Sequence, residues 1–145
     1  VGGGRWGGCG VGLSNVGNAG VVGHCGSMGP SIAAIEAVES AVGCIIEAVS
    51  KMGGGGLITA DDGNAEERMV FDGHGESEAC TKHSTKPVPC ILVDADYDGS
   101  YSLRQPEENQ DPQHQPGLAH LAATLFEAMG EPVPDDLYPS LIQHV

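Results

Sequence analysis

A long amphipathic helix that runs into four glycines and then into an apolar strand constrains the fold most strongly. Pro30 lies in its first turn, where the missing N–H removes no hydrogen bond. Apolar residues then recur at the spacing of one helix face, at Ile32, Ile35, Val38, Val42, Ile45, Ile46 and Val49. The pattern predicts a helix over residues 30–52, ended by the glycines at 53–56, and a buried strand over residues 57–60.

Shorter patterns on both sides of this helix complete the predicted order of elements. Strands are predicted over residues 11–16 and 87–93, with the prolines of the second held to its start. One-sided apolar residues predict another helix over residues 117–129, and Gly130 is its stop signal. The order strand, helix, strand, strand, helix predicts an α/β fold with a mostly parallel sheet flanked by helices.

The remaining segments are predicted to be irregular. Residues 1–10 are rich in glycine and are expected to be a flexible lead, so that the folded domain covers residues 11–145. Polar and proline-rich composition predicts loops at residues 63–86, 94–115 and 131–145. A chain of 145 residues is long enough for one ordinary domain.

Charge and cysteine content exclude some classes of partner and compartment. The formal net charge is −14, which disfavours nucleic acid and anionic membranes as partners. No apolar run approaches the roughly 20 residues that cross a bilayer. The five cysteines are odd in number and include no C-x-x-C pair, which favours a reducing compartment. Because the chain starts at Val1 rather than Met, an organelle interior after processing stays open.

The apolar strand ends in adjacent carboxylates, Asp61 and Asp62, followed by Gly63-Asn64. Open α/β sheets bind ligands at the carboxyl ends of their strands, and carboxylate oxygens suit Mg²⁺ or Mn²⁺. The same letters are also a common turn signal. A zinc cluster built from histidines and cysteines is a third reading, but its spacing fits no standard finger: His24, Cys25, His74, Cys80 and His83.

Three separated motifs carry a resemblance to a known family. Residues 59–66, TADDGNAE, closely resemble the segment TADHGNAE of cofactor-independent phosphoglycerate mutases, which belong to the alkaline phosphatase superfamily. Residues 18–24, NAGVVGH, are similar to NPDMVGH, and residues 81–89, TKHSTKPVP, to AHTTNPVP. The matches occur in the family's order. The resemblance implies the C-terminal portion of a metal-binding, alkaline-phosphatase-like domain over residues 11–145.

The resemblance implies a set of metal ligands, and two of its positions depart from the family. His24 and His83 would hold one Mn²⁺ or Mg²⁺, and Asp61 would hold the other. Asp62 stands where the family has a histidine ligand, and Gly20 stands where it has an aspartate ligand. Glycine supplies no side-chain ligand, so the resemblance implies a vestigial or weak site and names no catalytic residue.

These departures lead to two functional hypotheses. No segment resembles the family's serine nucleophile, and three arginines and three lysines are few for gripping a phosphorylated acid. The first hypothesis is therefore a catalytically impaired mutase-like protein that serves as a structural or interaction subunit of a larger assembly. The alternative is an active Mn²⁺- or Mg²⁺-dependent mutase that interconverts 2-phosphoglycerate and 3-phosphoglycerate. In that case this chain would be one piece of a split mutase or an incompletely defined portion of a full-length mutase.

Overall fold

The structure is a computed structural model that describes residues 10–24, 27–67, 69–71, 77–107 and 115–145. Almost all of the predicted glycine-rich lead therefore lies outside the described residues. The chain divides into two compact units, which are treated separately below. The first unit contains residues 1–41 and 64–84, and the second contains residues 42–63 and 85–145.

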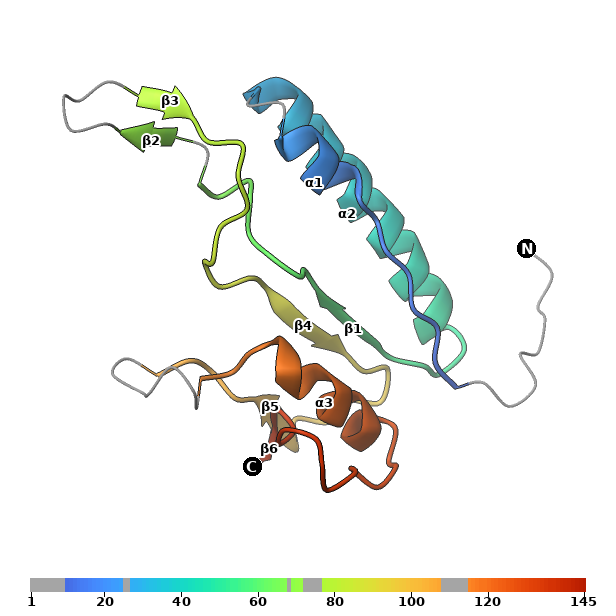
Figure 1. Ribbon diagram of the computed structural model, residues 1–145. Coiled ribbons are helices and arrows are strands. Elements are labelled where there is room, and N and C mark those ends of the chain that lie inside the picture. Colours follow the sequence, from blue (N-terminus) through green and yellow to red (C-terminus); the bar gives the residue numbers. More distant parts are fainter. Residues whose placement is uncertain (1–9, 25–26, 68, 72–76, 108–114) are drawn as a thin grey trace. The chain divides into compact units, whose positions relative to one another are not determined.

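The predicted long helix is confirmed. Helix α1 (Asn18–Gly23) is followed by α2 (Met28–Ser50), which begins two residues before Pro30 (Figure 1). The most covered side of α2 is a stripe at helical spacing, in which Ser31 and Ala34 are buried and Val38, Val42, Ile46 and Val49 are half-buried. The glycines end the helix as expected: Gly53 adopts φ 71° and the Gly54 N–H donates to the Val49 carbonyl at 3.0 Å.

Strands β1 (Gly56–Thr59) and β4 (Cys90–Val93) form a two-stranded antiparallel sheet that pairs Leu57 with Leu92 and Ile58 with Ile91. Gly55, which precedes β1, and Gly56, its first residue, are required by close approach. A Cβ at Gly55 would lie 2.5 Å from the Val93 carbonyl oxygen, and one at Gly56 would lie 2.7 Å from Ile46 Cδ1. The glycine run therefore both stops α2 and lets the next strand pass close to its neighbours.

Two further two-stranded sheets complete the described strands. Strand β2 (Met69–Phe71) pairs with β3 (Ser77–Ala79), and β5 (Tyr101–Leu103) pairs with β6 (Ile142–His144). Sequence patterns predicted neither pairing, because residues 63–86 and 131–145 were expected to be loops. Residues 11–16 hold no strand.

The helices and small sheets agree with the predicted α/β class, but the predicted parallel strand direction is wrong for the pairs that the structure describes. All three pairs are antiparallel. The parallel expectation treated the long helix as a crossover between two strands. Among described residues 10–24 and 27, which precede α2, there is no strand, so α2 does not connect parallel strands here.

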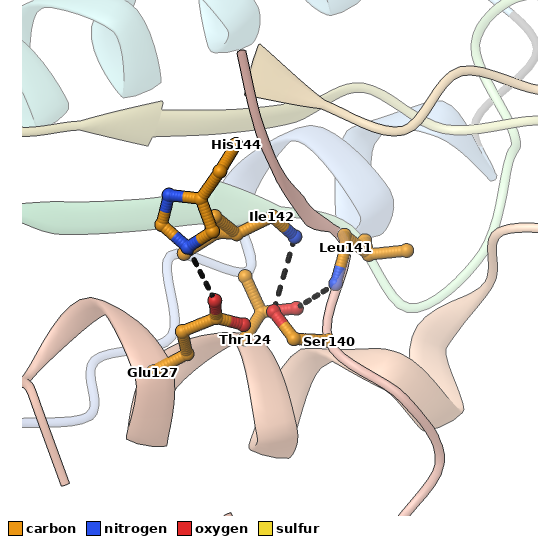
Figure 2. A network of polar contacts seen from close by, with 6 residues as sticks. All are labelled: Thr124, Glu127, Ser140, Leu141, Ile142 and His144. Atoms are coloured by element: carbon orange, nitrogen blue, oxygen red, sulfur yellow. Dashed lines mark hydrogen bonds and ion pairs between the residues drawn. The ribbon is translucent and has the colours of Figure 1, made fainter. Parts of the chain in front are cut away.

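The best-buried cluster of the second unit lies where α3 meets the C-terminal strand. A short 3₁₀ turn (Leu118–His120) leads into α3 (Leu121–Ala128), and Gly130 with φ 71° ends it, as predicted. Thr124 is fully buried, and its Oγ1 donates to the His120 carbonyl at 2.8 Å. The same oxygen accepts the Leu141 N–H at 2.9 Å (Figure 2). His144 Nε2 also lies 3.0 Å from Glu127 Oε1. These bonds fix β6 against α3.

None of the helices in the part of the chain that the structure describes is long and apolar enough to cross a membrane.

Candidate metal centre

His24 stands at the carboxyl end of α1. Its backbone N–H donates to the Gly20 carbonyl at 3.3 Å, so the residue continues the last helical turn. Its ring Nδ1 lies 2.5 Å from the Thr81 carbonyl oxygen. A carbonyl can only accept, so this bond requires the proton on Nδ1, and in the neutral ring Nε2 then carries the lone pair with which imidazole binds a metal ion. Metal-binding histidines are commonly oriented by this kind of bond from the other ring nitrogen.

His83 brings a second imidazole to the same place within the first unit. The ring centroids of His24 and His83 are 4.8 Å apart and the planes are inclined at 73°. Both side chains are exposed. The structure thus brings together the two histidines that the resemblance assigns to one metal, although they are 59 positions apart in the sequence (83 − 24).

Asn64 and Glu66, which sequence reasoning did not single out, lie beside this pair. Asn64 Nδ2 donates to the Lys82 carbonyl at 3.2 Å, and the Asn64 backbone N–H donates to Glu66 Oε2 at 2.8 Å. The Ser84 hydroxyl donates to Glu66 Oε1. The available signal was the family motif TADDGNAE itself, in which residues 64–66 are the final NAE; no ligand or positioning role was predicted for them.

Asp61 and Asp62 belong to the second unit and follow β1 in a bend, as the sequence predicted. Asp61 is exposed, whereas Asp62 is half-buried and takes part in an interaction of its own. The next residue, Gly63, is buried. Carboxylates thus stand directly after the strand, where ligand oxygens would be expected in an α/β domain.

The donor set of the first unit fits part of a metal's coordination shell. Two imidazoles supply only two of the six positions of an octahedral Mn²⁺ or Mg²⁺ site. Within the described ranges, no group of three or more histidine, cysteine, aspartate or glutamate side chains gathers closely enough to hold an ion. The position of the expected aspartate is open: a Cβ at Gly20 would meet no atom within 4 Å.

The rival zinc cluster receives no support from the described residues. Cys25 and His74 lie outside them. The three described members, His24, Cys80 and His83, do not form a metal-binding group.

Comparisons with known proteins agree on one family. The model of the Metalloenzyme superfamily matches residues 10–132. A 2,3-bisphosphoglycerate-independent phosphoglycerate mutase of Prochlorococcus marinus is 38% identical over 138 residues, covering 90% of this chain and 23% of the relative. A probable mutase of the same type from Arabidopsis thaliana is 34% identical over 139 residues, covering 90% and 24%.

A solved structure shows the same relationship in three dimensions. Leishmania mexicana phosphoglycerate mutase, crystallised at low cobalt concentration, superposes with a TM-score of 0.74 and 30% identity. The match covers 90% of this chain and 24% of that one. The chain therefore spans about a quarter of the length of the relatives that it matches.

Proposed function

Because the chain belongs to the Metalloenzyme superfamily, we propose that it is a phosphoglycerate mutase-like protein that binds a divalent cation weakly and is catalytically impaired. In this proposal it serves as a structural or interaction subunit of a larger assembly. The observation that carries the proposal is the His24–His83 pair, with ring centroids 4.8 Å apart. It lies at the end of α1, on which Gly20 stands where the family resemblance expects an aspartate.

The weakness of the site follows from ligand number. His24 and His83 offer neutral imidazole nitrogens, and Gly20 adds no oxygen donor on α1. Mn²⁺ and Mg²⁺ prefer carboxylate and water oxygens, so two imidazoles alone hold these ions poorly. A bound ion would polarise a phosphoryl oxygen, and the residues of this chain would hold and orient that ion.

The interaction role is supported by apolar side chains that the described residues leave uncovered. On α2, Met28 is 58% exposed, Ile32 is 50% exposed and Ile35 is 45% exposed. Water-exposed apolar residues in a row commonly mark a surface that another protein covers. A partner that buries this row is therefore part of the proposal.

Metal binding can be tested directly by titrating the purified chain with Co²⁺, followed by visible absorption, and with Mn²⁺, followed by calorimetry. We expect weak binding, and at least about a 10-fold further loss in His24→Ala and His83→Ala, since both ligands of a two-ligand site matter. His144→Ala removes a histidine outside the pair and is the matched control. Equal affinity in all four proteins would contradict the assignment of the site.

Impairment and assembly need separate measurements. The chain alone is expected to show no manganese-dependent interconversion of 3-phosphoglycerate and 2-phosphoglycerate, and turnover abolished by Asp61→Ala would overturn impairment.

Size-exclusion chromatography of the protein from its native source is expected to show a particle well above 14.8 kDa. Ile32→Glu and Ile35→Glu should reduce that mass, and a stable monomer would contradict the subunit role.

The second candidate is an active mutase, in which His24 and His83 would hold one Mn²⁺ or Mg²⁺, Asp61 would be a ligand of the other ion, and the missing groups would come from another polypeptide segment. The retained pairing of the two imidazoles favours it, because a site under no functional demand need not keep this geometry. Adding the proposed partner to the assay decides between the candidates. Turnover that appears only in the mixture, and that is lost in His24→Ala, would support the active alternative.

A further inference from the structure

We propose that Asn64 and Glu66 are positioning residues that hold His24 and His83 beside each other. This role concerns the arrangement of the two imidazoles, and only its effect on metal binding rests on the proposed function. Both residues lie in the first unit with the pair itself. They come from a loop that is distant in sequence from His24 and about 18 positions from the His83 segment.

Asn64 touches the chain next to each histidine. Its Nδ2 donates to the carbonyl of Lys82, the residue before His83, at 3.2 Å. Its Oδ1 lies against Gly23, the residue before His24, so closely that a Cβ at Gly23 would be 1.8 Å away. One amide side chain therefore spaces the backbone on both sides of the imidazole pair.

Glu66 completes the arrangement on the far side of His83. One carboxylate oxygen accepts the Asn64 N–H at 2.8 Å, and the other accepts the hydroxyl of Ser84, the residue after His83. His83 is thus held through Lys82 on one side and Ser84 on the other. A carboxylate that accepts two hydrogen bonds is rigidly oriented, and so are the groups that donate to it.

His24, at the end of α1, bonds to the same segment as Asn64 and Glu66. Its Nδ1 donates to the Thr81 carbonyl, one residue before Lys82. The same short segment, residues 81–84, is therefore bonded by His24, Asn64 and Glu66. Such outer groups fix the tautomer and direction of ligand imidazoles.

The surroundings of Asn64 Oδ1 favour a positioning role over simple stabilisation. This oxygen is hidden from water and has no hydrogen-bond partner among the residues that the structure describes. A buried amide oxygen without a donor costs free energy, so Asn64 is not an optimal residue for stability alone. Its placement against Gly23 accounts for its value in setting the spacing of the pair.

The test uses the metal-free chain, so that it does not depend on the proposed cation. In alkaline buffer, ¹⁵N-resolved NMR of the imidazoles should show His24 as the Nδ1–H tautomer, with a nuclear Overhauser contact between the two rings. We expect Asn64→Ala and Glu66→Gln to mix the tautomers and lose this contact while helicity by circular dichroism is kept. Glu39→Gln, on an exposed part of α2, is the control.

A milder variant protects the test against unfolding. Ser84→Ala removes one donor to Glu66 and nothing from the loop that carries Asn64. It should weaken the ring contact in a protein of unchanged helicity. An unchanged tautomer and an unchanged ring contact in the folded variants would overturn the positioning role.

Cobalt titration then separates this inference from the proposed function. We expect the Co²⁺ dissociation constant to rise roughly 10- to 100-fold in Asn64→Ala and Glu66→Gln, and by less than about 2-fold in Glu39→Gln. If the unaltered chain binds no cobalt, the proposed metal role fails and the NMR result still decides the positioning role. If cobalt binds equally to all variants, the positioning role fails and the metal site stands.

Discussion

The hydroxyl of Thr124 accepts the backbone N–H of Leu141 at 2.9 Å, joining α3 to the strand that ends the chain (Figure 2). The same oxygen donates to the His120 carbonyl one helical turn earlier. Thr124 is fully buried and Leu141 is 4% exposed, so water replaces neither bond. Thr124 therefore anchors α3 to Leu141, the residue directly before β6, and the contact of His144 with Glu127 adds a second link.

Thr124→Val tests this bond at constant shape. Valine fills the same space but leaves the Leu141 N–H buried without an acceptor, which costs about 1–3 kcal/mol of the free energy of unfolding. Urea denaturation followed by circular dichroism measures the loss. Thr124→Ser keeps the hydroxyl and should lose only the contribution of one methyl group, about 0.8 kcal/mol. A valine variant as stable as the unaltered chain would contradict the proposed role of the bond.

Alanine substitutions at two glycines of α1, Gly23 and Gly20, are predicted to have opposite effects on the stability of the chain. Gly23→Ala places a methyl group 1.8 Å from Asn64 Oδ1, and Asn64 can withdraw only by releasing the Lys82 carbonyl. We expect destabilisation by about 1–3 kcal/mol. Gly20→Ala meets open space, and its higher helix propensity should stabilise the chain by about 0.5–1 kcal/mol. Urea denaturation of both variants compares them, and equal effects would show that the Asn64 contact is absent in solution.

Local signals explain which parts of the fold could be predicted. The spacing of apolar residues and the glycines at 53–56 and 130 are features of neighbouring residues. The bounds of α2 and α3 were therefore predicted within a few positions. Strand partners are not local. The pairing of Tyr101 with His144 joins positions 43 apart (144 − 101), and no feature of either segment specifies the other. The antiparallel direction of the described pairs was missed for the same reason.

The candidate site divides in the same way. Asp61 and Asp62 were placed correctly after a strand, because strand and turn signals are adjacent in the sequence. The proximity of His24 and His83 came only from the family resemblance, since no spacing rule connects them. The contacts of Asn64 and Glu66 were not foreseen, because an Asn next to Gly is also a common turn residue. Their partners lie about 18 positions away.

Tyr101 gives a prediction at alkaline pH. Burial, and then the hydrogen bond that its hydroxyl donates to Asp94 Oδ2 at 2.8 Å, raise the pKa of Tyr101 from 10.0 to about 12. Because the folded-state pKa is above the unfolded value, the stabilisation is complete below about pH 10 and is lost as the pH rises to about 12. Tyrosinate absorbance should therefore show a late step that Tyr101→Phe removes and Asp94→Asn shifts to lower pH. Tyr138→Phe should leave that step in place, and its loss there would contradict the assignment.

Gly20→Asp should restore metal affinity if the weakness of the site lies at this position. Residues 20 and 24 are one helical turn apart, and the His24 N–H donates to the Gly20 carbonyl, so both side chains project from the same side of α1. An aspartate there adds a carboxylate beside the His24 imidazole, in space that holds no other atom within 4 Å of the Cβ. We expect Mn²⁺ and Co²⁺ to bind roughly 10-fold more tightly, by calorimetry and visible absorption.

Val21→Asp is the control for charge, because it adds the same carboxylate one position along at a side chain that is 71% exposed. It points away from the turn that Gly20 shares with His24, since residues adjacent in a helix do not face the same side. Tighter binding in Gly20→Asp alone, cancelled by a second change of His24→Ala, would assign the gain to a three-ligand site. Equal gains in Gly20→Asp and Val21→Asp would attribute the tighter binding to added negative charge. That result would contradict the interpretation of the imidazole pair as the remnant of a metal centre.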